Sequence, residues 1–584
     1  MKNRRLMSWL LCACLLTPLT GCKGAAHSSD SEESSTANPE ESGSADSGSS
    51  SEPLAETAEA MRFTAQGVTK TPQRFLKEQS QLVLTAPEGA EIYYTLDGSV
   101  PDKKNAEKYT EPICIKTRIA DFPVCTVLRA KAYFADGSES VTATQTFWAA
   151  GDIDTAFHNP VISLTGEPAE LTEKPDGIFY GENAKKTGRS SERAVSVEFV
   201  DDSGSELFAQ DAGLRIYGKA SRESSIKSVK LYARKSYDEA HGKFAYDGFG
   251  TADAEGGVIG KYDKLVVRNA GNDFQFAFIR DELNQTLAAE AGYTDGEGVL
   301  PVVVYLNGSY YGMHWLHESI CDDLLKDKYG GNKLGKFVIL EGREREKTVP
   351  KDDDETAAAA EAFEADYEAF SALDLTDDKN YQKVCEWMDV ENYLDYFAFN
   401  VCINNKDWPQ GNQKLYRFAA DSESGYDRSE GSRLDGRWRF WIHDTDYAEG
   451  LYEQTETQAE YNNLAQILDE KSNRYAPLFA ALMQREDCKS HFREKVRELM
   501  HGTLSSEHII ETLDRLNADR FSEMQRYFKH LEKLKQSDSS IWIWYQGYQE
   551  QTKMIRTFAV ARERYMEDFL TEALGDDADT ETDE

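Results

Sequence analysis

The sequence lacks several patterns, and their absence excludes whole classes of protein. Its nine cysteines include no C-x-x-C pair, which argues against a zinc cluster. Neither a G-x-x-x-x-G-K-[ST] loop nor a complete G-x-G-x-x-G loop occurs, so neither of these phosphate-binding turns is present. Beyond the first 22 residues no apolar run is long enough to cross a membrane, and there is no internal repeat.

Positive charge is also in short supply. The 66 lysines and arginines are outnumbered by 103 aspartates and glutamates, which leaves a formal net charge of -37. Because nucleic-acid phosphates are bound mainly by lysine and arginine, this balance predicts no nucleic-acid partner. It permits basic partners, although an acidic surface is also what keeps many proteins soluble.

The first 22 residues, "MKNRRLMSWLLCACLLTPLTGC", are typical of an export signal. A basic start with Lys2, Arg4 and Arg5 precedes a short apolar run. The run ends in "LTGC", which resembles a bacterial lipobox, so we expect Cys22 to be lipidated and to become the mature N-terminus. This predicts a lipoprotein on the outer face of the bacterial cytoplasmic membrane, or in a spore envelope. The alternative is an ordinary signal peptide with a chance cysteine.

Two segments are too polar to fold. Residues 23–62 consist mostly of Ser, Glu, Asp and Gly, and the tail at residues 575–584, "GDDADTETDE", is similar. Such segments bury too little apolar surface to offset the entropy of ordering the chain. They predict a disordered acidic tether and a disordered tail.

Residues 63–150 predict a small β-sandwich. Short alternating runs such as "QLVLTAP" and "TATQTFWA" are separated by Asp-Gly and Pro turns. The stretch "IYYTLDGSVPD" resembles the chitobiase/β-hexosaminidase C-terminal-type module, which has an immunoglobulin-like fold. For this module a spacer role is favoured over glycan contact, and Asp97-Gly98 is more simply a tight turn. Cys114 and Cys125, in neighbouring strand-like runs, could form a disulfide after export.

Residues 155–574 change from strands to helices. The runs "AVSVEFVDD", "AGLRIYGKAS", "SVKLYARK" and "VVVYLNGSYYGMHWL" are strand-like, with one helix, "RDELNQTLAAEAG", between the last two. From about residue 345 onward amphipathic helical patterns dominate, and Asp389 is the expected N-cap of one of them. The order of these elements predicts an α+β fold, a β-rich lobe followed by a helical lobe.

The candidate chemistry lies at "NNKDWPQGN", residues 404–412, and at "HDTD", residues 443–446. The first places Asp407 and Asn412 five positions apart after a helix, and the second places Asp444 and Asp446 at the end of a strand-like run. Phosphoryl transfer needs divalent cations held by hard oxygen ligands, beside an aspartate that orients the acceptor hydroxyl. On spacing alone an Asx or proline turn is the favoured explanation of the first stretch, and the strand-like run that ends in two alternating carboxylates makes the phosphoryl-transfer site an equal alternative.

A matching positive side is expected in the β-rich lobe. The stretch "YGKASRESSIKSVKLYAR" has a Gly/Ser-rich turn at Gly218, then Arg222, then Lys227 entering a strand. Backbone N–H groups of such a turn can approach phosphates, and a lysine on the strand can neutralise them. Gly218 alone is more simply a turn residue.

Taken in order, "PVISL", "LRIYGKASRESSIKSVKLYAR", "KLVVRNAGND", "RDELNQTLAAEAG", "VVVYLNGSYYGMHWLHESI", "INNKDWPQGNQKLYR" and "RWRFWIHDTDY" resemble the spore-coat protein H (CotH) kinase-like family over roughly residues 157–570. The resemblance implies an atypical, bilobal kinase-like fold that transfers the γ-phosphate of ATP to protein serines, with Mg²⁺ or Mn²⁺.

The resemblance also implies roles for individual residues. It makes Asp407 the catalytic aspartate, and Asn412 and Asp444 metal ligands with Asp446 as an alternative or second ligand. On the nucleotide side it implies Lys227, Arg222 and, after the Asn-Gly hairpin, Glu318.

Three features depart from the family pattern. Lys219 replaces a frequent second glycine, and "DSESGYDRSEGSRLDG", residues 421–436, looks like a surface insertion. His314, His317 and Glu318 follow in the order H-x-x-H-E on a strand, which does not match the H-E-x-x-H helix of metalloproteases. Residues three apart on a strand lie on opposite faces.

Three functions remain open from the sequence. The first is a surface-anchored protein serine kinase whose acceptor is an exported, basic, Ser-rich protein. The second is a non-catalytic envelope lipoprotein, a scaffold or glycan-binding adhesin, favoured by the scarcity of ATP outside the membrane. The third is nucleotidyl transfer on the same fold.

Overall fold

The computed structural model describes residues 56–117, 122–343, 346–347, 354–452, 458–469, 471, 476–539, 541 and 545–576. The expected signal segment, Cys22, most of the tether and nearly all of the acidic tail lie outside these residues. In the part of the chain that is described, no helix is long and apolar enough to span a membrane.

The first structured unit is a β-sandwich. Its two sheets have the strand orders β2-β1-β4-β7 and β3-β9-β8-β5-β6, and side chains including Phe63, Leu82, Leu128 and Phe147 fill the space between them. The strands are β1 (Glu56–Thr64), β2 (Gly67–Lys70), β3 (Phe75–Leu76), β4 (Ser80–Thr85), β5 (Glu91–Thr95), β6 (Glu107–Lys108), β7 (Ile113–Ile115), β8 (Val124–Tyr133) and β9 (Ala143–Ala149).

Two details of this module differ from the sequence-based expectation. The first strand begins at Glu56, inside the expected tether, because Ala60 and Met61 are fully buried although "ETAEAM" is too polar to stand out as a strand. Cys114 in β7 and Cys125 in β8 belong to different sheets, and both are free thiols, so the disulfide is not formed.

The second unit is a closed β-barrel with the order β10-β11-β12-β13-β16-β18-β17. Its interior is apolar and includes Val197, Leu231, Val267 and Leu316. The barrel strands are β10 (Val161–Thr165), β11 (Arg193–Val200), β12 (Glu206–Ile216), β13 (Val229–Tyr232), β16 (Lys264–Arg268), β17 (Val299–Leu306) and β18 (Ser309–Glu318). Short α2 (Pro168–Leu171) and the strands β14 (Phe244–Ala245) and β15 (Lys261–Tyr262) lie in its connections.

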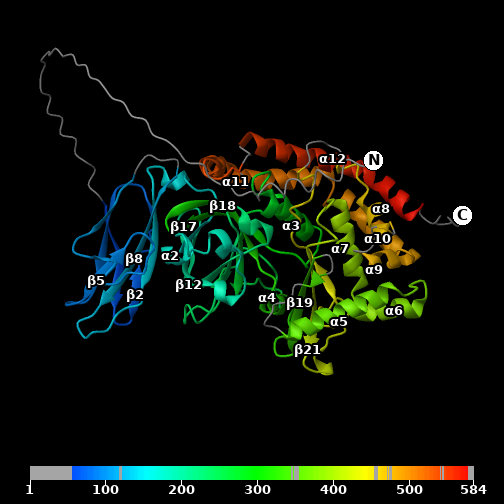
Figure 1. Cartoon of the computed structure of the whole chain (residues 1–584), viewed down its shortest axis with the longest axis horizontal. Helices are drawn as coiled ribbons and strands as arrows, with labels where there is room; N and C mark the ends of the chain where they lie inside the picture. Colours follow the sequence, from blue (N-terminus) through cyan, green and yellow to red (C-terminus); the bar gives the residue numbers. More distant parts are fainter. Residues whose placement is uncertain are drawn as a thin grey trace, which may run out of the picture. The chain divides into compact units, whose positions relative to one another are not determined.

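The second half of the chain is mainly helical, with α11 and α12 packed side by side (Figure 1). A small sheet of order β20-β19-β21-β22 accompanies the helices, so the α+β fold class is confirmed. The elements are α3 (Arg280–Glu290), α4 (Asp322–Tyr329), β19 (Gly335–Arg343), β20 (Glu346–Lys347), α5 (Asp354–Ser371), α6 (Asp378–Trp387), α7 (Val390–Cys402), β21 (Gln413–Ala420), β22 (Arg439–Trp441), α8 (Asn463–Leu468), α9 (Pro477–Leu482), α10 (Glu486–His501), α11 (Ser506–Lys535) and α12 (Tyr545–Leu574).

The sandwich packs directly on the barrel. Arg74 of the sandwich is 1% exposed and forms ion pairs with Glu198 (2.5 Å) and Glu206 of the barrel. The Trp148 ring of the sandwich contacts that of Tyr305 at 5.8 Å between centroids. Because buried charge and aromatic surface are shared across this junction, the sandwich and the barrel are joined by a buried interface and not by a free linker.

Candidate functional site

The loop with Asp407 and Asn412 is fixed by the helix before it. Asp389 caps α7, as expected, by accepting a hydrogen bond from the Asn392 backbone N–H at 3.2 Å. Within the loop Trp408 is 3% exposed and packs on Phe397 of α7, with 4.5 Å between ring centroids. This buried indole anchors the loop, so that its polar side chains are held where the helix ends.

Asp407 and Asn412 lie together in this loop, as expected. The Asn412 amide Nδ2 donates to Asp407 Oδ2 at 2.8 Å. Asn412 has a φ of +56°, in the left-handed region that asparagine tolerates better than most residues. This local turn directs the amide back onto the carboxylate five residues earlier.

Asp444 and Asp446 follow β22 and are joined by one guanidinium. Arg268 Nη2, from the end of β16, lies 2.6 Å from Asp444 Oδ1 and 2.9 Å from Asp446 Oδ2. Asp446 is 1% exposed and also accepts the Asn272 backbone N–H at 2.7 Å, whereas the Asp444 side chain is 31% exposed. Burial and the neighbouring Asp444 charge raise the pKa of Asp446 to about 7, against the effect of Arg268.

The two carboxylate segments run next to each other. The Lys406 N–H donates to Tyr447 O at 3.0 Å, and the Glu449 N–H donates to Ile403 O at 3.2 Å. The backbone that carries Asp407 is therefore hydrogen-bonded to the backbone just beyond Asp446. These contacts bring together loops that the sequence separates by about forty residues.

Lys227 and Arg222 stabilise the Gly/Ser turn itself. The Lys227 Nζ donates to the carbonyl oxygens of Arg222 (2.8 Å) and Ser224 (2.7 Å). Arg222 donates to the Gly218 oxygen and to the oxygens of Ala184 (3.0 Å) and Lys186. Burial lowers the pKa of both cations. The structure therefore places these two residues together on the turn and does not pair them with Asp407, Asp444 or Asp446.

Glu318 ends β18 and is almost fully buried. It accepts hydrogen bonds from the Tyr262 hydroxyl (2.9 Å) and from the Gly298 backbone N–H (2.8 Å). These contacts hold the carboxylate at the base of the barrel, where its charge acts on Lys328.

Two further lysines, one in each half of the domain, are close enough for the charge of one to act on the other. Lys230 lies on barrel strand β13, and Lys414, 6% exposed, lies on β21. Burial, then Lys264 and Lys414, lowers the pKa of Lys230 to about 8, with Glu297 acting in the opposite direction. Among the described residues, neither ammonium has a hydrogen bond or ion pair to a carboxylate.

The sequence reasoning missed Lys230 and Lys414. A signal was present, since each lysine is followed by alternating apolar residues, in "VKLY" and "QKLY", and a cation so placed on a buried strand needs a partner. In the sequence Lys227 is the more prominent candidate because it stands nearer to the Gly/Ser turn. Which of the two, Lys227 or Lys230, lies within reach of Lys414 depends on the register of β13.

A buried chain of acids and imidazoles links α3 to the "HDTD" segment. His317 of β18 donates to Glu282 Oε1 (3.2 Å) and to Glu297 Oε2 (3.1 Å), and His443 donates to Glu297 Oε1 (2.8 Å). Burial alone lowers the pKa of His317, but the bonds to Glu282 and Glu297 outweigh it and raise the pKa. For the acid Glu297 burial acts in the opposite direction and would raise the pKa, but His443 and His317 hold that pKa well below its ordinary value.

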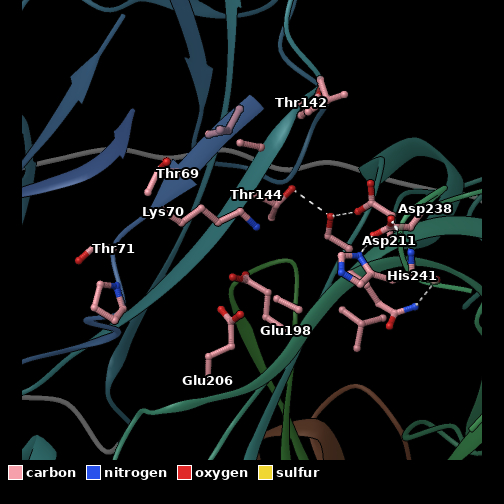
Figure 2. A pocket seen from close by; sticks show the side chains of 18 residues that line it. Thr69, Lys70, Thr71, Thr142, Thr144, Glu198, Glu206, Asp211, Asp238 and His241 are labelled. Carbon is pink, nitrogen blue, oxygen red and sulfur yellow. Dashed lines mark hydrogen bonds and ion pairs between the residues drawn. The ribbon is translucent and has the colours of Figure 1, made fainter. Parts of the chain in front are cut away.

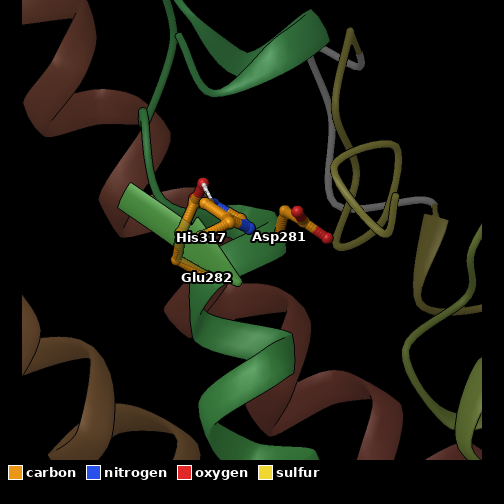
Figure 3. A group of neighbouring side chains, drawn as sticks. All are labelled: Asp281, Glu282 and His317. Atoms are coloured by element: carbon orange, nitrogen blue, oxygen red, sulfur yellow. Dashed lines mark hydrogen bonds and ion pairs between the residues drawn. The ribbon is translucent and has the colours of Figure 1, made fainter. Parts of the chain in front are cut away.

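Part of this chain has the spacing of a metal site. Ligand atoms of Asp281, Glu282 and His317 all lie within 4.8 Å of one another (Figure 3). Both ring nitrogens of His317 point at carboxylates, so both carry protons and neither has a lone pair for a metal. Asp281 is occupied by Arg268 and by the backbone and hydroxyl of Thr445. In this structure the three side chains form part of a hydrogen-bonded charge network.

His314 and His317 lie on opposite faces of β18, as strand geometry requires. His314 Nε2 is 3.2 Å from the Lys227 carbonyl oxygen, whereas His317 contacts Glu282 and Glu297. Burial lowers the pKa of His314 to about 4. The two imidazoles cannot share a metal, which excludes a metalloprotease arrangement here.

Comparison with known families decides the identity of the larger domain. The family model described as CotH kinase protein matches residues 214–566. The chain belongs to the CotH kinase family. A second model, described as Fn3 associated, matches residues 82–147, within the sandwich. No curated protein matches the chain. The resemblance drawn from the motifs is thus confirmed, together with a β module before the CotH domain.

Proposed function

We propose that this CotH kinase domain transfers the γ-phosphate of ATP to serine hydroxyls of exported or envelope proteins. The observation that carries the proposal is the pair formed by Lys230 and Lys414. The Lys414 side chain is buried and that of Lys230 is partly buried, and among the described residues neither positive charge has a hydrogen bond or ion pair to a carboxylate that would offset their mutual repulsion. A polyanion between the lobes would relieve that repulsion.

The carboxylate side fits a divalent cation. Asp444 is the accessible member of its pair, and beside it burial and the Asp444 charge raise the pKa of Asp446 against the effect of Arg268. The Asn412 Nδ2 donates a hydrogen bond to Asp407, so the amide oxygen is the atom of this side chain that could bind a metal ion. Carboxylate and amide oxygens are the ligands that Mg²⁺ and Mn²⁺ accept. Bound metal–ATP would supply the phosphoryl group and neutralise its charge.

The remaining steps fall to the protein's own groups. Asp407 orients the acceptor serine hydroxyl and takes its proton as the Oγ–P bond forms and the bond between the γ-phosphorus and the β,γ-bridging oxygen breaks. Asn412 fixes the Asp407 carboxylate for this task. Lys230 and Lys414 bind the phosphate oxygens, and Arg268 holds the "HDTD" segment.

Localisation and acceptor are part of the same proposal. Lipidated Cys22 would anchor the enzyme outside the cytoplasmic membrane or in a spore envelope, and the net charge of -37 favours basic acceptors. The role of the sandwich as a spacer stays a prediction, although its packing on the barrel means that it would move with the kinase domain.

The test is transfer of label from γ-labelled ATP to a panel of secreted proteins, with Asp407→Asn and Asp407→Ala alongside. The wild-type protein should label a serine-containing acceptor, and both variants should lose more than about a hundredfold in rate. Label from α-labelled ATP would instead indicate nucleotidyl transfer. No transfer, and no stabilisation by ATP with Mg²⁺, would favour a non-catalytic scaffold.

A further inference from the structure

A groove of about 630 Å³ runs along the junction between the sandwich and the barrel. One wall comes from β2 and the start of β9, and the other from β11, β12 and the loop that carries Asp238 and His241. Figure 2 shows Lys70 and Thr144 on the sandwich side, with Glu198, Asp211 and Asp238 on the barrel side. It lies apart from every residue assigned to phosphoryl transfer above.

The barrel wall of the groove carries an excess of carboxylates, although Asp238 Oδ2 lies 2.9 Å from Nδ1 of His241 in the same wall. Glu198 and Glu206 share the single cation Arg74. Asp211 accepts a hydrogen bond from the Ser196 hydroxyl, and within the described residues it has no lysine or arginine partner. Partial withdrawal from water raises the pKa of Asp211, and the charge of Asp238 adds to this effect, although Arg129 and Lys70 oppose it.

The sandwich wall is the edge of a sheet. Among the described strands β2 pairs with β1 alone, at the end of the order β2-β1-β4-β7. Thr71, one residue beyond β2, donates its backbone N–H to Ala60 O, so its backbone groups face β1. In an antiparallel pair successive residues alternate between facing the partner strand and facing away from it. The backbone groups of Val68 and Lys70 therefore face away from β1. Such an edge can pair with an additional extended segment.

The side-chain chemistry distinguishes between possible ligands. The eighteen residues that line the groove include no Phe, Tyr or Trp, the side chains on which the face of a sugar usually stacks, although His241 contributes an imidazole ring. The lining instead combines hydroxyl groups, carboxylates and an open strand edge. These groups match lysine or arginine side chains carried on an extended backbone.

We propose that this groove binds an extended, basic segment of a partner protein, with its backbone along β2 and its cationic side chains at Asp211 and Asp238. If the kinase activity proposed above holds, that partner is the phosphoacceptor, which would be held at a distance from Asp407. Binding itself does not depend on catalysis.

The experiment uses fluorescence anisotropy with the full chain carrying Asp407→Ala, without nucleotide. The probe is a labelled peptide of about twelve residues with lysine at alternate positions, roughly 40 Å when extended. Asp211→Asn combined with Asp238→Asn should weaken binding about tenfold, and rising salt should weaken it further. The control combines Glu532→Gln with Glu550→Gln, two exposed carboxylates on α11 and α12. This control removes the same amount of charge elsewhere on the protein, and its affinity for the peptide should stay within about twofold of that of the Asp407→Ala parent.

Backbone pairing is tested on the peptide. The same sequence N-methylated at alternate residues cannot donate to a strand edge and should bind at least tenfold more weakly. Equal weakening by the groove variant and the control variant would show non-specific attraction to an acidic protein and overturn the proposal. So would unchanged binding of the methylated peptide, or preferential binding of chitohexaose to the groove. Because the protein is catalytically disabled, failure here is distinct from failure of the kinase proposal.

Discussion

Replacing Lys230 by methionine tests the phosphate site through two effects of opposite sign. The pKa of Lys230 lies at about 8, below its ordinary value of 10.5, because of burial and then the nearby Lys264 and Lys414. A fall of that size corresponds to about 3 kcal/mol of unfavourable free energy for the charged form at neutral pH. Lys230→Met removes this term and keeps the volume, so the nucleotide-free protein should gain up to about 3 kcal/mol of stability.

The same substitution should damage nucleotide binding. A charge-assisted contact to a phosphate is worth about 1.5–3 kcal/mol, so losing it should weaken ATP about ten- to a hundredfold. Urea denaturation at pH 7 with and without ATP and Mg²⁺ measures both effects. Wild-type stability should rise with ligand, and the variant should be more stable without ligand but gain little from it.

The pH dependence has a defined sign. Between about pH 8 and pH 10.5 the folded protein has lost the Lys230 proton while the unfolded chain retains it, so stability rises with pH in this window. Lys230→Met should lack this rise. Lys230→Arg keeps the charge, and Lys379→Met changes an exposed lysine on α6, so both serve as controls. A Lys230→Met protein that is less stable without nucleotide and still fully stabilised by ATP would refute the reasoning.

Three further predictions concern buried charge. Arg268→Met should lower the free energy of unfolding by about 3–5 kcal/mol, because it leaves the carboxylates of Asp444 and Asp446 without their cation. Arg268→Lys should lose less, and a denaturant midpoint of Arg268→Met equal to that of the wild type would count against the ion pairs. Burial raises the pKa of Glu523 to about 7. Between about pH 4.5 and 7 the folded protein keeps the Glu523 proton while the unfolded chain loses it, so the free energy of unfolding falls as pH rises through this range. Glu523→Gln should therefore be about 3 kcal/mol more stable than wild type at pH 8 but not at pH 4, and equal melting curves at both pH values would exclude the shift. Arg74→Met should lower the free energy of unfolding, measured with urea, by about 3–5 kcal/mol, because it leaves Glu198 buried without its cation. The double variant with Glu198→Gln should recover part of that loss, and no recovery would mean that the ion pair is not the cause.

The sequence predicted local arrangements well. Asp407 and Asn412 were expected in one polar loop after a helix, and a hydrogen bond of 2.8 Å joins them there. Asp389 was recognisable as an N-cap because capping depends only on the residue type and on the helix that follows. The ordered motifs were also sufficient to identify the CotH family, since such an order survives where single motifs are common.

Contacts between distant segments were not predictable in the same way. Arg268 was never considered, yet it holds both carboxylates of the "HDTD" segment, about 176 residues further along the chain. His317 was examined only for a metal motif, because its partners Glu282 and Glu297 come from other elements. Lys230 and Lys414 stand on a barrel strand and on a strand of the second sheet, yet the charge of Lys414 lowers the pKa of Lys230. Nothing in the local pattern of either strand specifies that interaction.

By itself the chain determined its α+β class, the family it belongs to and the turns that carry its polar motifs, because these depend on hydrophobic periodicity and on interactions within a few residues. Tertiary structure alone decided which charges share a buried site. A side chain loses its water on burial, and the free energy of its charged form then depends on whatever distant segment packs against it. That neighbour is set by closure of the barrel and by docking of the lobes, which no short stretch of sequence encodes.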